Sequence, residues 1–443
     1  ARGARAAHGL WPRRGRRGLR RAYRVPTAVS VPGYRFRPTP PSLLDMLRHG
    51  VADVAAVIPA TILEEPAVQL PGPGAPLVVA DPELVRELLG DRTGNFARNR
   101  MMRRLFRRTW GTGLAAAEGK SWQAQRRAAA PFFRPAAIAA QAEGFIRATD
   151  DVLAEYADGG SVELTSLARR IVARVVFGQL VAAGDEADAD EIAHLMPEYV
   201  ALVSAFGPAD LAPLPESWID GLRGLHNARS TTRIAAISHA IAAARKDKER
   251  SDDLIDMLAP VGPVEDNIRG LLPAAMDSTA AGVTWALYCL AKMPDWQSRC
   301  LESGPDTLRP FVREVLRLFP PGPHLVRTAA MDDALGGYRV RKGQTIVASI
   351  YAMHRHRAHW HNPDSFDPSR FGPGAPRQVA YLPFGTGERM CIAAQFAELE
   401  ILTIAHRIAR RFRIEVEERP SVSLKVATRP VGAVPARLVP RGT

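Results

Sequence analysis

Residues 381–396 (YLPFGTGERMCIAAQF) combine residue types and a spacing that can support chemistry. Gly385 and Gly387 let the backbone turn sharply and approach another group closely. Arg389 brings a positive charge close to Cys391, and a helical pattern begins directly after the cysteine. Positive charge and the amino end of a helix both favour the thiolate form of a cysteine. We therefore expect Cys391 to act as a nucleophile or as a ligand of a metal.

The number and spacing of the cysteines narrow this choice. A zinc site needs several ligands, and no second cysteine or histidine is near Cys391 in the sequence. A haem iron, in contrast, needs only one axial thiolate. We interpret Cys289 and Cys300 as packing residues, because they lie in or just after an apolar helical run. Three cysteines cannot form a disulfide framework, which favours a reducing, intracellular setting.

Residues 384–393 (FGTGERMCIA) resemble the haem-binding loop of the cytochrome P450 monooxygenases, whose pattern is F-G-x-G-x-R-x-C-x-G. The positions that match are Phe384, Gly385, Gly387, Arg389 and Cys391. Ala393 replaces the last glycine, so a small residue is kept there. The resemblance implies that Cys391 is the axial ligand of the iron of haem b, and that Arg389 contacts a haem propionate.

Two further motifs follow the order and spacing of this family. SWQAQRR holds Trp122 and Arg126 one helical turn apart, as in the family's W-x-x-x-R, and PPGPHLVRTA contains Arg327. The resemblance implies that Trp122, Arg126 and Arg327 are propionate partners, since indole N–H and guanidinium groups both donate hydrogen bonds. Taken alone, Trp122 and Arg126 also fit an exposed amphipathic helix.

Three more charged residues resemble a structural cluster of the family. EVLR supplies Glu314 and Arg317 on one helix face, and FDPSRF supplies Arg370. The resemblance implies that these three form a buried cluster that braces the cysteine loop. Without the resemblance, Glu314 and Arg317 would be interpreted as a surface ion pair.

A long apolar helix expected over residues 262–294 contains AAMDST, which is similar to the family's A-G-x-D/E-T-T. A carboxylate inside such a helix needs a partner or a task. The resemblance implies that Asp277, Ser278 and Thr279 take part in proton delivery to the iron site. Ala275 replaces the usual glycine, and Ser278 keeps a hydroxyl but lacks the methyl group of threonine.

The helices and strands that must position these residues indicate a mainly α protein with a small β-rich part, and the resemblance implies a large helical haem-thiolate monooxygenase fold. DPELVRELLGD reads as a helix capped by Asp81, and helical periodicity dominates residues 120–300. Strands are expected over residues 60–70, 75–80 and parts of 325–385. We expect residues 26–443 to form a single domain, with a mobile loop over residues 206–221.

The net charge of +13 comes mostly from residues 1–25, which hold nine arginines and no acidic residue. We interpret this segment as a disordered basic extension. A nucleic-acid arm, a membrane-surface arm and a transit peptide are less favoured readings of it. The sequence contains no apolar run of about 18 residues, so no membrane span is predicted.

The resemblance also implies a substrate and partners. No flavin or iron–sulfur domain is visible, so electrons are expected from a separate ferredoxin or flavodoxin with its reductase. Basic side chains that could face such an acidic partner are Arg127, Arg407, Arg410 and Arg411, although a solvated face explains them equally well. Residues 94–118 and 190–225 are expected to form the roof of the substrate site. Their bulky apolar residues and arginines suit a lipophilic molecule, such as a fatty acid or terpenoid acid.

Three other interpretations remain open from the sequence. The same fold could serve a peroxide-driven enzyme, an isomerase or dehydratase, although the Asp277–Ser278 pair argues against these. A haem carrier or sensor without catalysis is also possible. The run HRHRAHWH, with His354, His356, His359 and His361, could mark a metal site, but the family has a turn-rich stretch there. We expect a cytoplasmic, monomeric bacterial enzyme that does not bind nucleic acid.

Overall fold

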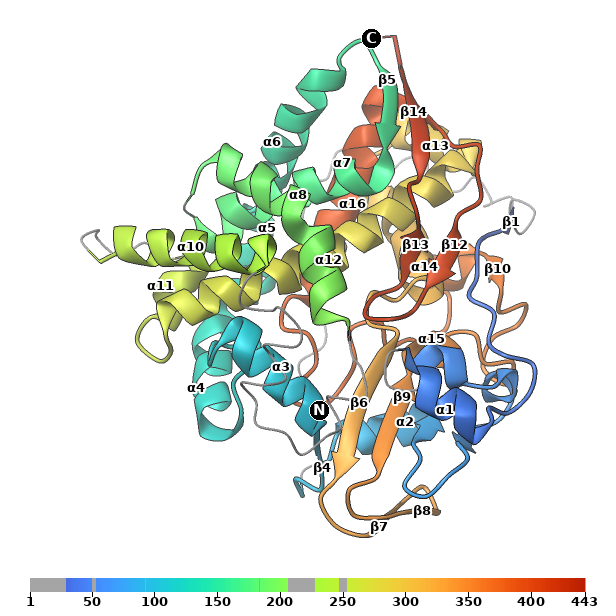
Figure 1. Cartoon of the computed structure of the whole chain (residues 1–443). Coiled ribbons are helices and arrows are strands. Elements are labelled where there is room, and N and C mark those ends of the chain that lie inside the picture. The colour runs from blue at the N-terminus through green and yellow to red at the C-terminus, as the bar shows by residue number, and fades with distance from the viewer. Residues whose placement is uncertain are drawn as a thin grey trace.

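The computed structural model describes residues 29–49, 53–91, 93–182, 184–205, 228–246 and 253–442. Most long segments are helices, and they gather on one side of the molecule, with the largest sheet at the other (Figure 1). The mainly α fold with a small β-rich part is confirmed. The basic extension of residues 1–25 and the loop expected at 206–221 lie outside the described residues.

The largest sheet has five short strands, in the order β2-β3-β9-β6-β4. Their bounds are Ala67–Gln69 (β2), Leu77–Val79 (β3), Thr345–Ser349 (β9), His324–Ala329 (β6) and Phe96–Arg98 (β4). Only β3 and β9 pair in parallel. The register of the last pair places Arg98 opposite Arg327. Like charges at directly opposite positions destabilise a sheet, so this pair needs a compensating anion.

One long helix, α12 (Val264–Ala291), runs through the helical part and packs against α7 (Leu164–Val175) and α16 (Ala394–Arg411). Its carboxyl-terminal half is buried nearly all round, which fits its apolar sequence. Pro273 lies inside the helix, as the sequence indicated. Residues of both α12 and α16 line the cavity beside Cys391, so the two helices form part of its wall.

The other helices and strands complete these two parts. The helices are α1 (Leu43–His49), α2 (Pro82–Leu89), α3 (Arg100–Trp110), α4 (Gly119–Ala129), α5 (Pro135–Ala140), α6 (Ala142–Leu153), α8 (Glu186–Val203), α10 (Arg229–Ala244), α11 (Leu254–Leu258), α13 (Pro294–Glu302), α14 (Arg309–Leu318) and α15 (Ile350–Met353). The smaller sheets are β11-β14-β5 (Phe412–Glu415, Pro435–Pro440, Gly160–Glu163), β12-β13 (Ser421–Ser423, Arg429–Val431), β7-β8 (Asp333–Leu335, Tyr338–Val340) and β1-β10 (Val29–Ser30, Ser365–Phe366).

Local sequence chemistry explains where several elements begin. The Asp81 carboxylate accepts hydrogen bonds from two backbone N–H groups at the start of α2, as predicted. The strand expected from residue 60 is wrong at its start, because Ala60–Leu63 form a 3₁₀ helix and the strand begins at Ala67. Ile62 is the one buried residue of this 3₁₀ helix, so the alternating burial of a half-buried strand is absent from Ala60–Leu63.

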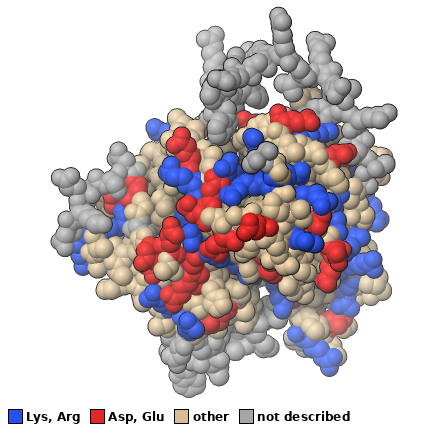
Figure 2. Space-filling model, turned by 90° about the horizontal axis from the view of Figure 1, so that it is seen from above, with Lys and Arg blue, Asp and Glu red and all other residues tan. Residues whose placement is uncertain are grey.

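Charged side chains of both signs are present on the face seen in Figure 2. Several charged residues of the chain form ion pairs, as where Arg170 contacts both Glu155 and Asp190. Among the described residues, no helix is both long enough and apolar enough to cross a membrane.

Candidate functional site

A cavity of about 410 Å³ lies between α12, α16, strand β6 and the cysteine loop, residues 381–393. Its wall is mainly apolar. The residues with polar or charged groups on it are Arg98, Ser278, Thr279, His324, Arg327, Thr386, Arg389, Cys391 and Glu400. The wall therefore brings together residues that are far apart in the chain.

The cysteine loop is held by its own backbone. The Cys391 N–H donates to the Phe384 carbonyl oxygen at 3.0 Å, and Gly385 N–H donates to Leu382 at 3.0 Å. Gly385 and Gly387 have φ values of +72° and +75°, which favour glycine. A Cβ atom at Gly387 would lie 2.0 Å from the carbonyl oxygen of Leu89. A side chain at position 387 would therefore displace the loop from the end of α2.

The Cys391 side chain is exposed on the cavity wall, although protein surrounds it on its other sides. Burial raises the pKa of the Cys391 thiol, and the Ala393 N–H and the charge of Arg126 only partly oppose this effect. The expectation that the loop alone favours the thiolate is therefore wrong. Desolvation outweighs the nearby positive charge, so a metal cation bound to the sulfur would have to supply the missing stabilisation.

Three arginines line the cavity beside the cysteine loop, and within the described part of the chain only two of them pair with a carboxylate, that of Glu118. Glu118 lies 3.4 Å from Arg98 and 2.7 Å from Arg389. Arg327 donates to the Val326 carbonyl oxygen and forms no ion pair among the described residues. Burial lowers the pKa of both Arg327 and Arg389 to about 10, and the charge of Arg98 adds to this effect. The cluster has two positive charges in excess, so it is suited to a ligand with two carboxylates, such as haem.

Trp122 and Arg126 lie behind Arg389 rather than on the cavity wall. The Arg389 guanidinium carbon lies 3.9 Å from the centre of the Trp122 ring, and that of Arg126 lies 6.0 Å from it. Arg389 also donates to the Ala117 carbonyl oxygen at 2.9 Å. The indole therefore supports the guanidinium that faces the cavity, in an arrangement typical of cation–π contacts.

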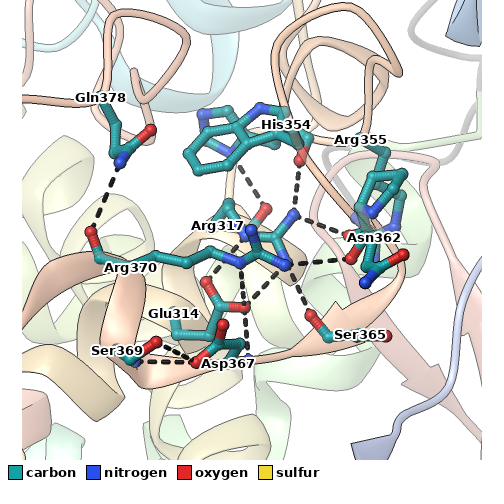
Figure 3. A network of polar contacts seen from close by, with 12 residues as sticks. Glu314, Arg317, His354, Arg355, Asn362, Ser365, Asp367, Ser369, Arg370 and Gln378 are labelled. Atoms are coloured by element: carbon teal, nitrogen blue, oxygen red, sulfur yellow. Dashed lines mark hydrogen bonds and ion pairs between the residues drawn. The ribbon is translucent and has the colours of Figure 1, made fainter. Parts of the chain in front are cut away.

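Glu314, Arg317 and Arg370 meet in a buried network of polar contacts (Figure 3). The Glu314 carboxylate accepts two hydrogen bonds from Arg317, at 2.7 and 2.8 Å, and both side chains are fully buried. The Arg317 guanidinium also donates to the carbonyl oxygens of His354, Pro363 and Ser365. Arg370 lies 3.5 Å from Glu314. The network therefore satisfies most of its own donors and acceptors.

His354 connects this network to the cysteine loop. Its Nδ1 lies 2.9 Å from the Arg317 carbonyl oxygen, and Leu382 N–H lies 2.9 Å from Nε2. This pair of contacts requires a neutral ring that donates from Nδ1 and accepts at Nε2. Burial, assisted by the charges of Arg317 and Arg355, lowers the pKa of His354 to about 3. Arg317 thus holds the loop through one neutral histidine.

The comparisons with known proteins agree with this geometry. The family model described as cytochrome P450 matches residues 70–303 and 306–434. The chain belongs to the cytochrome P450 family. This membership places it among the oxidoreductases of monooxygenase type that bind haem through a cysteine thiolate.

Individual relatives extend this result. Cyclooctatin synthase of Streptomyces melanosporofaciens is 30% identical, over 74% of this chain and 78% of its own length. The protein LUTEIN DEFICIENT 5, chloroplastic, of Arabidopsis thaliana is 24% identical, and the match covers 78% of this chain but 66% of that protein. A 6-coordinated cytochrome P450 from Thermus thermophilus superposes with a TM-score of 0.70 at 25% identity, covering 85% of this chain and 95% of the other.

Within the P450 fold, α12 turns one face to the cavity. Ala275, Ser278 and Thr279 line the wall, and the Ser278 hydroxyl donates to the Ala274 carbonyl oxygen at 3.0 Å. Asp277 is not on the wall; it forms an ion pair with Arg429 of β13. The spacing explains this separation, because residues three and four positions after Ala275 share its helix face, while Asp277 is rotated away from it.

The histidine-rich run does not form a metal site. His354 is engaged in the network, and His359 lies 3.3 Å from Asp81. The described residues contain no group of three or more potential metal-binding side chains. His354 and His356 are buried in this turn.

Sequence reasoning missed four polar residues on the cavity wall: Arg98, Thr386, Glu400 and His324. Glu400 of α16 is buried, its Oε1 has no hydrogen-bond partner among the described residues, and burial raises the pKa of its carboxyl group well above the usual range. Both ring nitrogens of His324 also lack partners in the described part of the chain, and burial lowers the pKa of its ring to about 4. The sequence contained a signal for Glu400, because helical periodicity places it on the same face of α16 as Phe396. It contained no such signal for His324, because its strand is only partly buried.

Proposed function

We propose that the chain hydroxylates a lipophilic small molecule, using O₂ and electrons from a separate ferredoxin- or flavodoxin-type protein, with haem b held by Cys391. The observation that carries this proposal is the excess of two positive charges on the cavity wall opposite a single exposed cysteine. Haem supplies the oxygen activation when it is bound, and the protein supplies placement, protons and exclusion of water.

The chain's own residues have distinct proposed roles. Arg98, Arg327 and Arg389 hold the two carboxylates of the cofactor, and Trp122 keeps Arg389 in place. The Ser278 hydroxyl turns from the Ala274 carbonyl oxygen toward the cavity and holds a proton there. Its contact with Ala274 is a single hydrogen bond, which a rotation about χ1 can exchange for one in the cavity.

The lining of the cavity supports a lipophilic substrate. Met102, Phe106, Leu180 and Ile401 are among the apolar residues on its wall. The α3 arginines do not reach this wall, so they give no support to the expected substrate carboxylate. Names such as beta-amyrin 6-beta-monooxygenase of Solanum lycopersicum and cyclooctatin synthase belong to relatives that act on different compounds, and they do not choose among substrates.

Of the four arginines considered as contacts for the electron donor, two are already paired with a carboxylate of the protein. Arg407 forms two hydrogen bonds with Asp150, and Arg411 lies 3.6 Å from the same carboxylate. Arg127 and Arg410 are exposed and form no ion pair among the described residues. We propose that these two side chains contact an acidic partner.

The test of the proposed function combines a spectrum with turnover. The reduced protein with carbon monoxide should show the thiolate-type Soret band, and NAD(P)H with a donor system should yield a hydroxylated product. Cys391→Ser should abolish the thiolate band, whereas Cys300→Ser, a change at a buried cysteine of α13, should keep it. A band without turnover would favour a carrier or sensor, and turnover with peroxide alone would favour the peroxide-driven enzyme.

Ser278→Ala should uncouple the reaction, because the cavity then lacks the proposed proton-holding hydroxyl. We expect several-fold more peroxide released per NAD(P)H consumed, in line with the 10²–10⁴-fold span of general acid–base contributions, of which a hydroxyl relay is a small part. Ser166→Ala, at an exposed position of α7, is the control. Unchanged coupling in Ser278→Ala would exclude the proposed role.

A further inference from the structure

Helix α3 has two faces of opposite character. Met102 and Phe106, four residues apart, line the main cavity. Four arginines spaced as helical neighbours line a second pocket of about 380 Å³ on the other side of the helix: Arg100, Arg103, Arg104 and Arg107. We call this second space the arginine pocket.

Among the described residues, the opposite wall of the arginine pocket contains little negative charge. It is formed by residues between 111 and 121, including Ala116, Ala117 and Ser121, and Glu118 is the one carboxylate that these residues supply. That carboxylate already pairs with Arg98 and Arg389 on the main-cavity side. Asp266 is close, since it accepts from Thr112, but it pairs with Arg269 and is not on the wall.

Positive charge therefore remains in excess in the arginine pocket. Arg100, Arg103 and Arg107 are exposed, and none of them forms an ion pair or hydrogen bond through its side chain with the described residues. Like charges three or four residues apart on a helix repel one another. These three residues alone create the excess, whatever Arg104 contacts.

We propose that the arginine pocket binds a small molecule through a diphosphate or polyphosphate group. Guanidinium groups form paired, charge-assisted hydrogen bonds with phosphate oxygens, and several arginines at one pocket favour a multivalent anion over a single carboxylate. The concave shape and the volume favour a small ligand rather than a flat protein surface. This site is separate from the proposed haem and substrate site and does not depend on the proposed activity.

The segment that separates the two cavities, which we call the partition, links binding in the arginine pocket to the active site. Residues 116–118 line the arginine pocket, while the carbonyl oxygens of Ala115 and Ala117 accept hydrogen bonds from Arg98 and Arg389 of the main cavity. The Arg98 guanidinium also lies 5.8 Å from the centre of the Phe106 ring. An anion that fixes α3 and this partition therefore stabilises the wall of the main cavity.

Titration calorimetry of the full-length holoprotein with inorganic pyrophosphate tests the proposal directly. We expect saturable one-to-one binding that weakens as salt is added. Arg103→Gln/Arg107→Gln should weaken it at least tenfold, and Arg103→Lys should weaken it less, since the charge is kept but the fork geometry is lost. Arg147→Gln/Arg413→Gln removes the same charge from exposed positions elsewhere and should bind as the parent does.

The choice of ligand sharpens the result. Adenosine diphosphate that binds more tightly than pyrophosphate would show that the site accepts an organic diphosphate, and equal affinity would show that the phosphates alone are recognised. Citrate that binds as tightly as pyrophosphate would overturn the phosphate assignment. Absence of saturable pyrophosphate binding, or equal affinity in Arg103→Gln/Arg107→Gln and the control pair, would overturn the site, with the Soret band and turnover unaffected in either case.

Discussion

Two arginine clusters flank the cysteine loop, and they differ in what completes them. In the buried network, the Arg317 guanidinium donates hydrogen bonds to the Glu314 carboxylate and to three carbonyl oxygens, all supplied by the protein. On the cavity side, Arg98 and Arg389 share the carboxylate of Glu118, and Arg327 forms no ion pair among the described residues. A cluster that satisfies its own charges stabilises the fold, whereas a cluster with charge in excess is suited to a ligand. The same residue type therefore serves structure in one region and binding in the other.

The largest expected effect is on the stability of the cluster of Glu314 and Arg317, whose charges are balanced within the protein. Glu314→Gln leaves the charge of Arg317 buried without a carboxylate, and we expect a loss of about 3–5 kcal/mol in the free energy of unfolding. Urea unfolding of the holoprotein measures it. The control is Glu398→Gln, which breaks contacts with the half-exposed Arg309 and Arg313 and should cost about 1 kcal/mol. Equal losses in the two variants would contradict the assignment of Glu314 to the structural core.

Substitutions in the cavity cluster of Arg98, Arg327 and Arg389 should weaken the binding of haem rather than the stability of the fold. Arg389→Gln removes charge-assisted hydrogen bonds to the cofactor, each contributing about 1.5–3 kcal/mol, so haem should dissociate roughly 10–100 times faster. The unfolding free energy of the haem-free protein should change by less than about 1 kcal/mol, because relief from Arg98 and Arg327 offsets the lost contact with Glu118. Haem transfer to an acceptor protein measures the first quantity. Arg147→Gln is the control.

If Arg389→Gln instead destabilised the haem-free protein strongly and left haem dissociation unchanged, the two clusters would have the same role. The comparison would then fail on the cavity side.

The sequence predicted one cluster better than the other, for a physical reason. Glu314 and Arg317 are helical neighbours, so local spacing and the motif bring them together. Arg98 meets Arg327 only through the register of two short strands that are far apart in the chain. Residues of this kind carry no local signal, and only tertiary pairing places them.

The helical phase of residues 101–108 already separates the apolar residues from the arginines. The run MMRRLFRR was expected to bring apolar residues and arginines to the substrate site together. In the structure, Met102 and Phe106 face the cavity, while Arg103 and Arg107 face away from it. The spacing of four within each pair predicts this separation. Asp277 is a similar case, since its position next to Ser278 in sequence turns it to another face of α12.

A third prediction compares two histidines with lowered pKa values, one from each region. His354 has two hydrogen-bond partners and a pKa of about 3, and His324 has none and a pKa of about 4. Both values lie below the unfolded value of about 6.5, so the unfolded state binds more protons in acid. Stability is therefore fully present above about pH 6.5 and falls as the pH drops toward 4, by about 1.4 kcal/mol per pH unit for each histidine.

Replacement of each histidine by leucine separates the two contributions. His324→Leu should make the acid dependence shallower, by about 2 kcal/mol at about pH 5, without loss at pH 7, since it removes no hydrogen bond. His354→Leu should lose stability at pH 7 as well, because Leu382 N–H and the Arg317 carbonyl oxygen lose their partner. Urea unfolding at several pH values tests both, and an unchanged pH slope in His324→Leu would contradict the neutral state of its ring.

The smallest expected effect concerns the second buried glutamate, Glu400. Burial raises the pKa of its carboxyl group well above its usual range, which favours the neutral form, and its Oε1 has no partner among the described residues. Glu400→Gln replaces a neutral carboxyl by a neutral amide of the same shape, and we expect a change below about 0.5 kcal/mol. Glu314→Gln is the same substitution at a buried glutamate that holds a cation. A loss of several kcal/mol in Glu400→Gln would mean that this carboxyl group is ionised, and the cavity would then contain an anion that balances part of the charge of its arginines.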